Sequence, residues 1–316
     1  MQHKILFFLL LISISCTSQV KSDSNRIESP VSLKTSTGEI FGTLTTPLNF
    51  SNGPLVLIIA GSGPTDRNGN NPMMKNNNLQ QLAWGLSEAG IATIRYDKRG
   101  IAASSKAMKS EADLRFEDYI NDIKDWIAFI KKDNRFSKII IAGHSEGSLL
   151  GMIAARGIAD QFISIAGLGK PANETLREQL ESQPEQVKEI AFPILDSLSV
   201  GLTVSNPNPM LAALFRPSVQ PYLISWFNYN PQTEITKLKM PVLIAQGDQD
   251  IQVTVKDAEL LANAKKDAQL FVIKGMNHIF KMVSSDDRNE NIKTYSNPNL
   301  PISTALLDKI ISFIKP

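Results

Sequence analysis

Apolar residues in this chain occur in short continuous runs that alternate with segments of helical periodicity. A continuous apolar run of strand length is typical of a strand buried on both faces, as in parallel sheets. Six such runs are found, at residues 54–60, 91–96, 138–142, 161–166, 241–246 and 268–273. Helices are indicated at 79–90, 116–130, 255–264 and 301–314. This alternation predicts an α/β fold whose mostly parallel sheet is covered on both faces.

Two segments stand outside this alternation. Residues 31–46 form two β-prone runs around a Thr-Gly pair, which predicts a hairpin. Between about 170 and 238 many prolines separate helical patches near 174–183 and 210–215, which predicts a helical cap inserted into the sheet domain. The aromatic residues of this segment either pack internally or form a substrate wall, and both readings stay open: Trp226, Phe227 and Tyr229.

The chain begins with a short basic start, an apolar run and small residues, which is typical of a secretory signal over residues 1–15. Cys16 follows directly and resembles the lipidation site of a bacterial lipoprotein, with ordinary cleavage and a free thiol as the alternative. Residues 16–29 are expected to form a flexible tether before a folded domain over 30–316. We therefore expect an extracytoplasmic protein of the bacterial cell envelope, held by an N-terminal lipid anchor, or otherwise periplasmic or secreted.

Composition excludes several classes of function. The formal net charge is only +2 over 316 residues, so no electrostatic footprint for nucleic acid is visible. With one cysteine and three histidines, neither an intramolecular disulfide nor a cluster of soft metal ligands is expected. The sequence also has no Gly-x-x-x-x-Gly-Lys loop for a nucleotide. We therefore expect no metal and no cofactor.

The strongest chemical signal is Gly143-His144-Ser145-Glu146-Gly147, which lies between a predicted buried strand and a run of helix formers. A strand, a sharp turn and a helix expose the serine hydroxyl, which makes Ser145 the candidate nucleophile. Gly143 and Gly147 provide neighbours without side chains where the turn packs tightly. The helix that begins near Glu146 directs free N–H groups at the same place, so the Glu146 N–H is a candidate oxyanion donor.

A serine hydroxyl needs a base to remove its proton, and the base needs a carboxylate to hold its tautomer. His3 lies in the predicted signal, and His144 lies inside the turn, where it faces the wrong way for proton transfer. His278 remains, on a Gly-containing loop after the last predicted strand. Two carboxylates, Asp248 and Asp250, follow the preceding strand, and either gives the chain order Ser, Asp, His.

Over residues 31–316 the sequence resembles the α/β-hydrolase superfamily. In that family the acid commonly lies three residues after a strand-ending Gly, and the spacing from Gly247 favours Asp250. The resemblance leaves Asp248 as a turn-capping residue. Many family members have His-Gly-x after the first central strand, and this chain has Ala-Gly-Ser there. The resemblance therefore implies Ser62 as the second oxyanion donor, with Gly63 as the fallback.

A narrower resemblance rests on three segments: Gly61-Ser62-Gly63-Pro64-Thr65-Asp66-Arg67, Asp97-Lys98-Arg99-Gly100 and the serine motif. They are similar to secreted carboxylesterases of the EstD type, near the serine-aminopeptidase-like branch, which implies hydrolysis of short acyl esters. Asp97 and Arg99 are expected to brace a loop beside the site, although Arg99 could bind an acidic substrate group. The side chain of Glu146 either tunes the site or caps its helix.

The leading hypothesis is a serine esterase that acts on small-molecule, short-chain esters through Ser145, His278 and Asp250. The first alternative is a peptidase or aminopeptidase of the same fold, which would need an acidic pocket for a substrate amine. The second is a non-catalytic binding protein, which would have no chemical reason to retain all three residues. The third is a lipase acting at an interface, which would need a larger exposed apolar cap.

Overall fold

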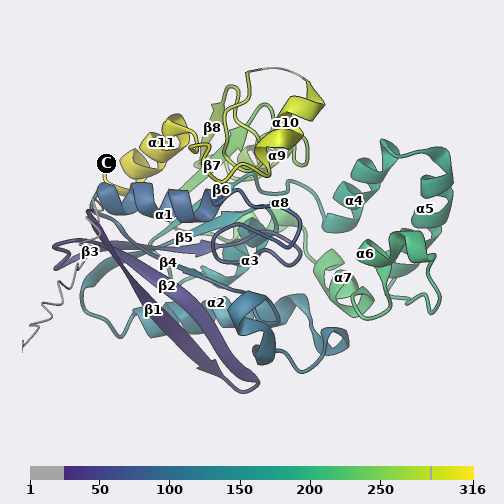
Figure 1. Cartoon of the computed structure of the whole chain (residues 1–316), viewed down its shortest axis with the longest axis horizontal. Helices are drawn as coiled ribbons and strands as arrows, with labels where there is room; N and C mark the ends of the chain where they lie inside the picture. Colours follow the sequence, from purple (N-terminus) through teal and green to yellow (C-terminus); the bar gives the residue numbers. More distant parts are fainter. Residues whose placement is uncertain (1–24, 285–286) are drawn as a thin grey trace, which may run out of the picture.

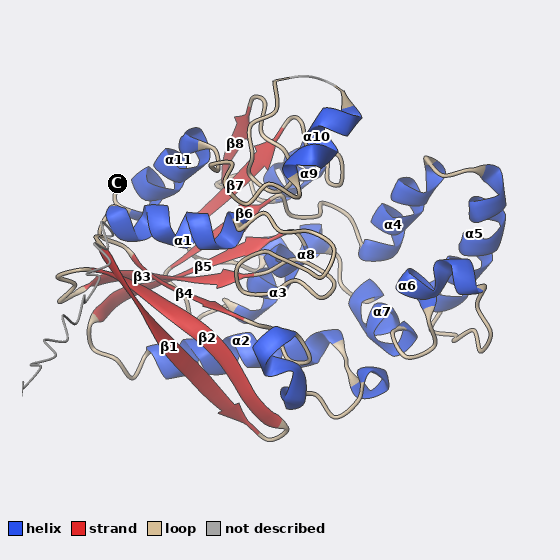
Figure 2. Cartoon of the chain, viewed as in Figure 1, coloured by secondary structure: helices blue, strands red, loops and turns tan. Residues whose placement is uncertain are grey.

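The computed structural model of the chain describes residues 25–284 and 287–316. The predicted signal, Cys16 and most of the predicted tether lie outside the described residues. The described chain folds around one eight-stranded sheet with helices on both faces (Figures 1 and 2). Its strands are β1 (Arg26–Thr35), β2 (Gly38–Pro47), β3 (Gly53–Ile59), β4 (Ala92–Tyr96), β5 (Phe136–His144), β6 (Gln161–Ile165), β7 (Val242–Gly247) and β8 (Gln269–Ile273).

The strand order is β1-β2-β4-β3-β5-β6-β7-β8. The pairs β1–β2 and β2–β4 are antiparallel, and every pair from β4 to β8 is parallel. The central strands β3 and β5 lie side by side, with Leu57 opposite Ile141. The predicted mostly parallel sheet is confirmed, and all six predicted apolar runs are strands of it.

The sequence of β3 shows why these strands are apolar throughout. Leu55 and Leu57 belong to the buried cluster on one face of the sheet, whereas Val56 and Ile58 belong to the cluster on the other face. Because side chains alternate between the faces of a strand, a strand covered on both sides needs apolar residues at every position.

The helices that cover the sheet are α1 (Asn78–Glu88), α2 (Phe116–Ile130), α3 (Glu146–Ala154), α8 (Pro231–Thr236), α9 (Val255–Ala264) and α11 (Thr304–Ile314). A short helix, α10 (Arg288–Thr294), lies in the connection between β8 and α11. Helices α1 and α11 pack on one face, whereas α2, α3, α8 and α9 contribute to the buried cluster on the other (Figure 1). Short 3₁₀ turns are η1 (Ala102–Ala107), η2 (Glu111–Asp113) and η3 (Pro209–Leu211). No helix in the described part of the chain combines the length and apolar content that a membrane span needs.

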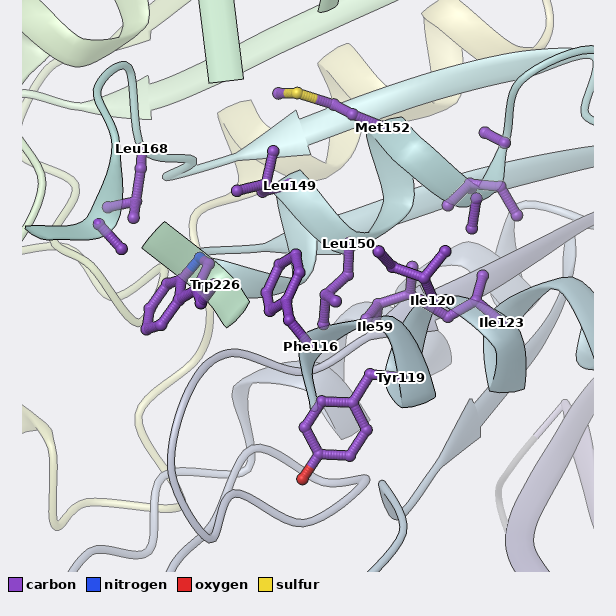
Figure 3. Close-up of a cluster of buried hydrophobic side chains, with 14 of the residues drawn as sticks. Ile59, Phe116, Tyr119, Ile120, Ile123, Leu149, Leu150, Met152, Leu168 and Trp226 are labelled. Carbon is purple, nitrogen blue, oxygen red and sulfur yellow. The ribbon is translucent and has the colours of Figure 1, made fainter. Parts of the chain in front are cut away.

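The cluster on the α2 and α3 face continues from the sheet into the cap. Figure 3 shows Ile59 of β3 near Leu150 of α3, with Phe116 of α2 between them and Trp226. The rings of Phe116 and Trp226 are stacked, with centroids 5.8 Å apart. Burying large apolar side chains on both sides of this junction stabilises the contact between cap and sheet domain.

The cap leaves the sheet after β6 and returns at β7. Its helices are α4 (Ala172–Glu181), α5 (Glu185–Ser199), α6 (Ala212–Phe215) and α7 (Gln220–Phe227), which lie together at one end of the molecule (Figure 2). Helix α8 falls inside the predicted cap range of 170–238, but it packs against α3 and α9 of the sheet domain. Ile235 of α8 is fully buried there, so the cap ends before this helix.

The hairpin predicted at residues 31–46 is present and longer than predicted. Strand β1 begins at Arg26, which pairs with Pro47 at the end of β2. The carboxylate of Glu28 accepts hydrogen bonds from Arg95 Nη2 at 2.6 Å and from Trp84 Nε1 at 3.0 Å. The predicted end of the tether at residue 29 is therefore wrong, because an edge strand with one solvated face can be as polar as a tether.

Candidate active site

Ser145 occupies a strained turn between β5 and α3. Its φ of 55° and ψ of −122° lie in a region that side-chain-bearing residues rarely adopt. The Ser145 N–H donates to the Ile165 carbonyl at 3.0 Å, which ties the turn to the neighbouring strand. Ser145 is the N-cap residue of α3, yet its side chain caps none of the helix N–H groups. The hydroxyl therefore remains available, and Ser145 lines the large cavity beneath the cap.

The two glycines of the motif are needed for close backbone contacts. A Cβ atom at Gly143 would lie 2.2 Å from the Gly147 carbonyl oxygen. A Cβ atom at Gly147 would lie 2.6 Å from the carbonyl oxygens of both Ile59 and Ala60. Helix α3 is thus packed directly on the backbone of β3 and β5, which brings its N-terminus to the edge of the sheet.

The structure brings the predicted base and acid together. His278 Nδ1 lies 2.7 Å from Asp250 Oδ2, and both side chains are buried. Asp250 Oδ1 also accepts from the N–H groups of Gln252 at 2.8 Å and Val253 at 3.0 Å. Since a carboxylate can only accept, Nδ1 carries the proton, and the Nε2 of a neutral His278 ring is left to accept one.

Burial alone would raise the pKa of Asp250, but the neighbouring His278 and the two backbone donors outweigh burial and hold that pKa below its ordinary value. Asp248 has a different position. It is exposed, and its Oδ1 accepts from the Gly275 N–H at 2.6 Å. This bond joins the loop after β7 to the loop after β8, so Asp248 links two loops instead of capping its own turn as expected.

His144 supports His278 from behind. Its Nε2 lies 2.9 Å from the His278 carbonyl oxygen, and the two ring centroids are 4.7 Å apart. A carbonyl can only accept, so Nε2 of His144 carries the proton. Burial, together with the nearby His278, lowers the pKa of His144 to about 3. His144 is therefore a neutral donor that ties the loop of His278 to the residue before Ser145.

This depressed pKa predicts a pH-dependent stability. Below pH 6.5 the unfolded chain protonates His144 but the folded protein does not, so the free energy of unfolding falls as pH drops toward about 3. We expect His144→Gln, which keeps an N–H donor, to reduce this loss by about 1 kcal/mol per pH unit between pH 6 and 4. Urea unfolding at several pH values measures it. Equal slopes for the two proteins would contradict the assignment.

The predicted second oxyanion donor, Ser62, lines the same cavity as the serine. Ser62 and Gly63 line the cavity together with Ser145 and Glu146. The preceding residue is in close contact with the nucleophile turn, since a Cβ atom at Gly61 would lie 3.2 Å from Cβ of Ser145. The loop after β3 and the start of α3 therefore lie beside each other at the serine, where two backbone donors to one oxyanion would be needed.

Sequence reasoning missed Lys98. Its ammonium is almost fully buried and donates to Glu146 Oε2 at 2.9 Å and to the Gly61 carbonyl at 2.7 Å. The remaining carboxylate oxygen of Glu146 accepts from the hydroxyl of Tyr222 in the cap. Glu146 is thus part of a buried ion pair. A lysine two residues after a strand buried at every position is unusual, and this signal could have drawn attention to Lys98.

Asp97 and Arg99 brace the neighbouring loops, which is the first of the two roles expected for them; the other was the binding of an acidic substrate group by Arg99. Asp97 accepts from Arg67 Nη2 at 2.7 Å and from the Ala103 N–H at 3.1 Å. Arg99 Nε donates to Asp122 Oδ2 at 2.8 Å. Arg99 also lines the cavity, but its guanidinium is already paired with a carboxylate.

The cavity under the cap has a volume of about 760 Å³ and a largely apolar wall. The cap contributes apolar residues from α4 and α7 and from the segments between them: Leu176, Leu214, Val219, Leu223 and Trp226. Trp226 therefore serves both alternatives, since it stacks on Phe116 and also faces the cavity. Tyr229 packs against Phe116 and donates to Glu117 at 2.8 Å.

Among residues 25–284 and 287–316, no three His, Cys, Asp or Glu side chains gather as metal ligands would.

Comparisons with known proteins agree with this architecture. A sequence model described as "Serine aminopeptidase, S33" matches residues 74–220. Esterase EstD of Thermotoga maritima is 25% identical over 266 residues, which are 80% of this chain and 60% of that protein. The chain thus spans about three fifths of the length of this relative.

Solved structures are similar over nearly the whole chain. Est1E from Butyrivibrio proteoclasticus, in a structure with ferulic acid bound, has a TM-score of 0.62 and 20% identity, covering 90% of this chain and 100% of its own. The α/β hydrolase GrgF from Penicillium sp. sh18 has a TM-score of 0.60 and 20% identity, covering 92% and 98%. The predicted fold class is confirmed: this chain has the α/β-hydrolase fold, with a helical cap over the C-terminal edge of the sheet.

Proposed function

We propose that this protein is a serine carboxylesterase that cleaves short-chain esters through an acyl-enzyme. The observation that carries the proposal is the buried Asp250–His278 hydrogen bond, held against the strained turn of Ser145. A hydroxyl, an imidazole with a free Nε2 and a carboxylate on its Nδ1 are the three parts that nucleophilic acyl transfer needs.

In the proposed reaction, Ser145 Oγ attacks the ester carbonyl carbon while His278 Nε2 takes its proton. The carbonyl oxygen becomes an oxyanion that accepts from the N–H groups of Ser62 and Glu146. The C–O bond to the alcohol then breaks, and His278 returns the proton to the leaving alcohol. Water repeats the sequence on the acyl-enzyme and releases the acid.

The charges around the cavity favour a neutral substrate over the amine of an aminopeptidase substrate. Among the described residues, the carboxylates that line it are Glu111 and Glu146, and both are already paired. Glu111 accepts from Arg216 Nε at 2.8 Å, and Glu146 accepts from Lys98. An ammonium group would find no free countercharge there, so its desolvation would oppose binding. An uncharged ester with an apolar group suits the apolar wall.

The test is a series of p-nitrophenyl esters from acetate to long acyl chains, beside aminoacyl p-nitroanilides. We expect turnover that is highest on short chains and at least about a hundredfold lower on the anilides, together with covalent labelling of Ser145 by a fluorophosphonate probe, located by mass spectrometry. Rates that rise with chain length would instead indicate a lipase. Anilide turnover alone would indicate a peptidase, and no turnover or labelling would indicate a binding protein.

The sequence of residues 1–16 supports the proposal that this activity is located in the cell envelope. Export followed by lipidation at Cys16 would anchor the enzyme in the cell envelope by acyl chains. Incorporation of a fatty-acid analogue that depends on Cys16 tests this part of the proposal.

A further inference from the structure

Lys98, Glu146 and Tyr222 form a buried polar chain beside the nucleophile, and the triad chemistry does not use it. Lys98 lies two residues after the end of β4, Glu146 is the first residue of α3, and Tyr222 belongs to the cap helix α7. The side chains of Lys98 and Glu146 are 1% and 2% exposed. A buried ion pair is costly to desolvate and is often no more stable than apolar residues in its place, so its presence calls for another role.

The first clue to this role is the bond from Lys98 to Gly61. The carbonyl of Gly61 and the N–H of Ser62 belong to the same peptide unit, and this unit is planar and trans. Its C=O and N–H therefore point in opposite directions. Because Lys98 fixes the direction of the carbonyl, it also fixes the direction of the Ser62 N–H. An ammonium on the carbonyl oxygen further polarises the amide and strengthens the N–H as a donor.

The second clue is that the same ammonium holds Glu146. The backbone N–H of Glu146 is the other predicted oxyanion donor, and its side chain is clamped between Lys98 and Tyr222. Lys98 thus bonds to the peptide unit that presents one donor and to the side chain of the residue that presents the other. Its Nζ also lies 4.9 Å from the centroid of the Tyr119 ring, which packs edge-on against Tyr222.

The third clue is that the chain ends in the cap. Burial, followed by the neighbouring Glu146 carboxylate, raises the pKa of Tyr222 well above its ordinary value, so the hydroxyl keeps its proton and donates. Without this donor, one oxygen of a buried carboxylate would lose its hydrogen bond. The carboxylate is thus fully bonded only when α7 is seated against the sheet domain.

We propose that Lys98 is a positioning residue for both donors of the oxyanion hole, and that Tyr222 makes this positioning depend on the seating of the cap. The inference rests on the proposed esterase function. It predicts that weakening the chain lowers stabilisation of the oxyanion and leaves binding of the uncharged substrate unchanged. If the chain of Lys98, Glu146 and Tyr222 had a merely structural role, weakening it would instead reduce the amount of folded protein. Oxyanion stabilisation and substrate binding would then not be separated.

The experiment compares Tyr222→Phe with a matched control, Tyr229→Phe. Both changes remove a tyrosine hydroxyl that joins the region of α7 to a glutamate of the sheet domain. Glu117, the partner of Tyr229, lies on α2 and is not among the described residues that line the cavity. We expect Tyr222→Phe to lower kcat on p-nitrophenyl butyrate about tenfold with KM changed less than about twofold, and Tyr229→Phe to change neither. Lys98→Met would remove the hydrogen bonds to both Gly61 and Glu146 at once, whereas Glu146→Gln keeps an oxygen that can accept from Lys98, so Glu146→Gln is the second variant. The double variant Tyr222→Phe/Glu146→Gln should lose less than the product of the single losses.

A second readout separates positioning from folding. Ser145 Oγ adds to the carbonyl carbon of a trifluoromethyl ketone, its proton passes to His278, and the ketone oxygen becomes an oxyanion. Inhibition by this ketone should weaken in Tyr222→Phe by about the factor lost in kcat/KM, whereas competitive binding of the matching alcohol should not change. If Tyr222→Phe and Tyr229→Phe match in kcat and in ketone affinity, the inference is overturned while the esterase remains. A wild type without ester turnover or ketone inhibition overturns the proposed function and the inference with it.

Discussion

Replacing Asp250 by asparagine is expected to lower kcat on p-nitrophenyl esters by about 10⁴-fold with little change in fold. Asp250 accepts the proton of His278 Nδ1, which leaves Nε2 as an acceptor for the hydroxyl of Ser145. An asparagine amide can donate to Nδ1 instead. The ring proton then sits on Nε2, where it blocks transfer from the serine, and the imidazolium formed in the reaction loses its countercharge.

The neighbouring carboxylate provides the control. Asp248→Asn removes a charge two residues away but leaves the His278 pair intact, because the Asp248 carboxylate accepts from the Gly275 N–H. We expect its kcat to stay within about twofold of the wild type, whereas Asp250→Asn should approach the floor set by Ser145→Ala. Steady-state kinetics with circular dichroism as a folding check measures all three. Comparable losses in the two aspartate variants would reject Asp250 as the acid.

The second large effect is expected at Gly143. In Gly143→Ala the new Cβ atom would lie 2.2 Å from the Gly147 carbonyl oxygen and 2.6 Å from Cα of Ser148. Both are backbone atoms of the tightly packed turn, so no side-chain rotation can relieve the contact. The α3 N-terminus must move away from β5, and we expect a loss of about 4 kcal/mol or more in the free energy of unfolding, or no folded protein.

Gly157→Ala separates this steric effect from backbone strain. Gly157 has a φ of 69°, which disfavours alanine, but no atom lies within 4 Å of the place that the new Cβ atom would take. Its expected loss is about 1 kcal/mol, the cost of a left-handed conformation alone. Thermal or urea unfolding of the two variants measures the difference. A Gly143→Ala protein as stable as Gly157→Ala would show that the turn has room to adapt.

The helices predicted best from the sequence carry both a periodic apolar face and a local signal at their first turn. Helices α2 and α9 begin and end where predicted. In each, the N–H of the N-cap residue donates to the aspartate three positions later, from Arg115 to Asp118 Oδ2 at 2.8 Å and from Thr254 to Asp257 Oδ2 at 3.0 Å. Helix α11 begins at Thr304 rather than near 301, because Ser303 is its N-cap and accepts from the Leu306 N–H. Such signals act within a few residues, so a single sequence contains them.

The cap was predicted least well, because its prolines suggested breaks in structure. Several of them instead start helices: Pro184 is the N-cap of α5, and Pro231 is the first residue of α8. At the first turn a helix N–H has no partner, so proline costs nothing there. Pro193 lies inside α5 on its exposed side, while Ile194 and Leu195 beside it are buried. Tertiary packing thus overrides the local penalty, and this packing is invisible in the sequence.

The candidate site also has a part that the sequence predicts and a part that it does not. Ser145, Asp250 and His278 follow predicted strands, so the topology of a parallel sheet already brings them to one edge. Their supports come from distant parts of the chain. Lys98 meets Glu146 across 48 positions, and Tyr222 reaches it from the cap across 76. Contacts over such separations depend on the folded backbone, and neither the spacing nor the chemistry of the single residues indicated them.

The place of the cap in the chain bears on how such an enzyme can diversify. The cap leaves and rejoins the sheet at adjacent strands, with Ile165 of β6 opposite Ala245 of β7. Recombination or insertion between these strands can therefore replace the wall that selects substrates while leaving the reacting groups where they are. Such an exchange meets one constraint at Glu146. A new cap that brings no donor to this buried carboxylate would inherit an unsatisfied oxygen beside the serine, so its first descendants should need a compensating change at Glu146 or Lys98.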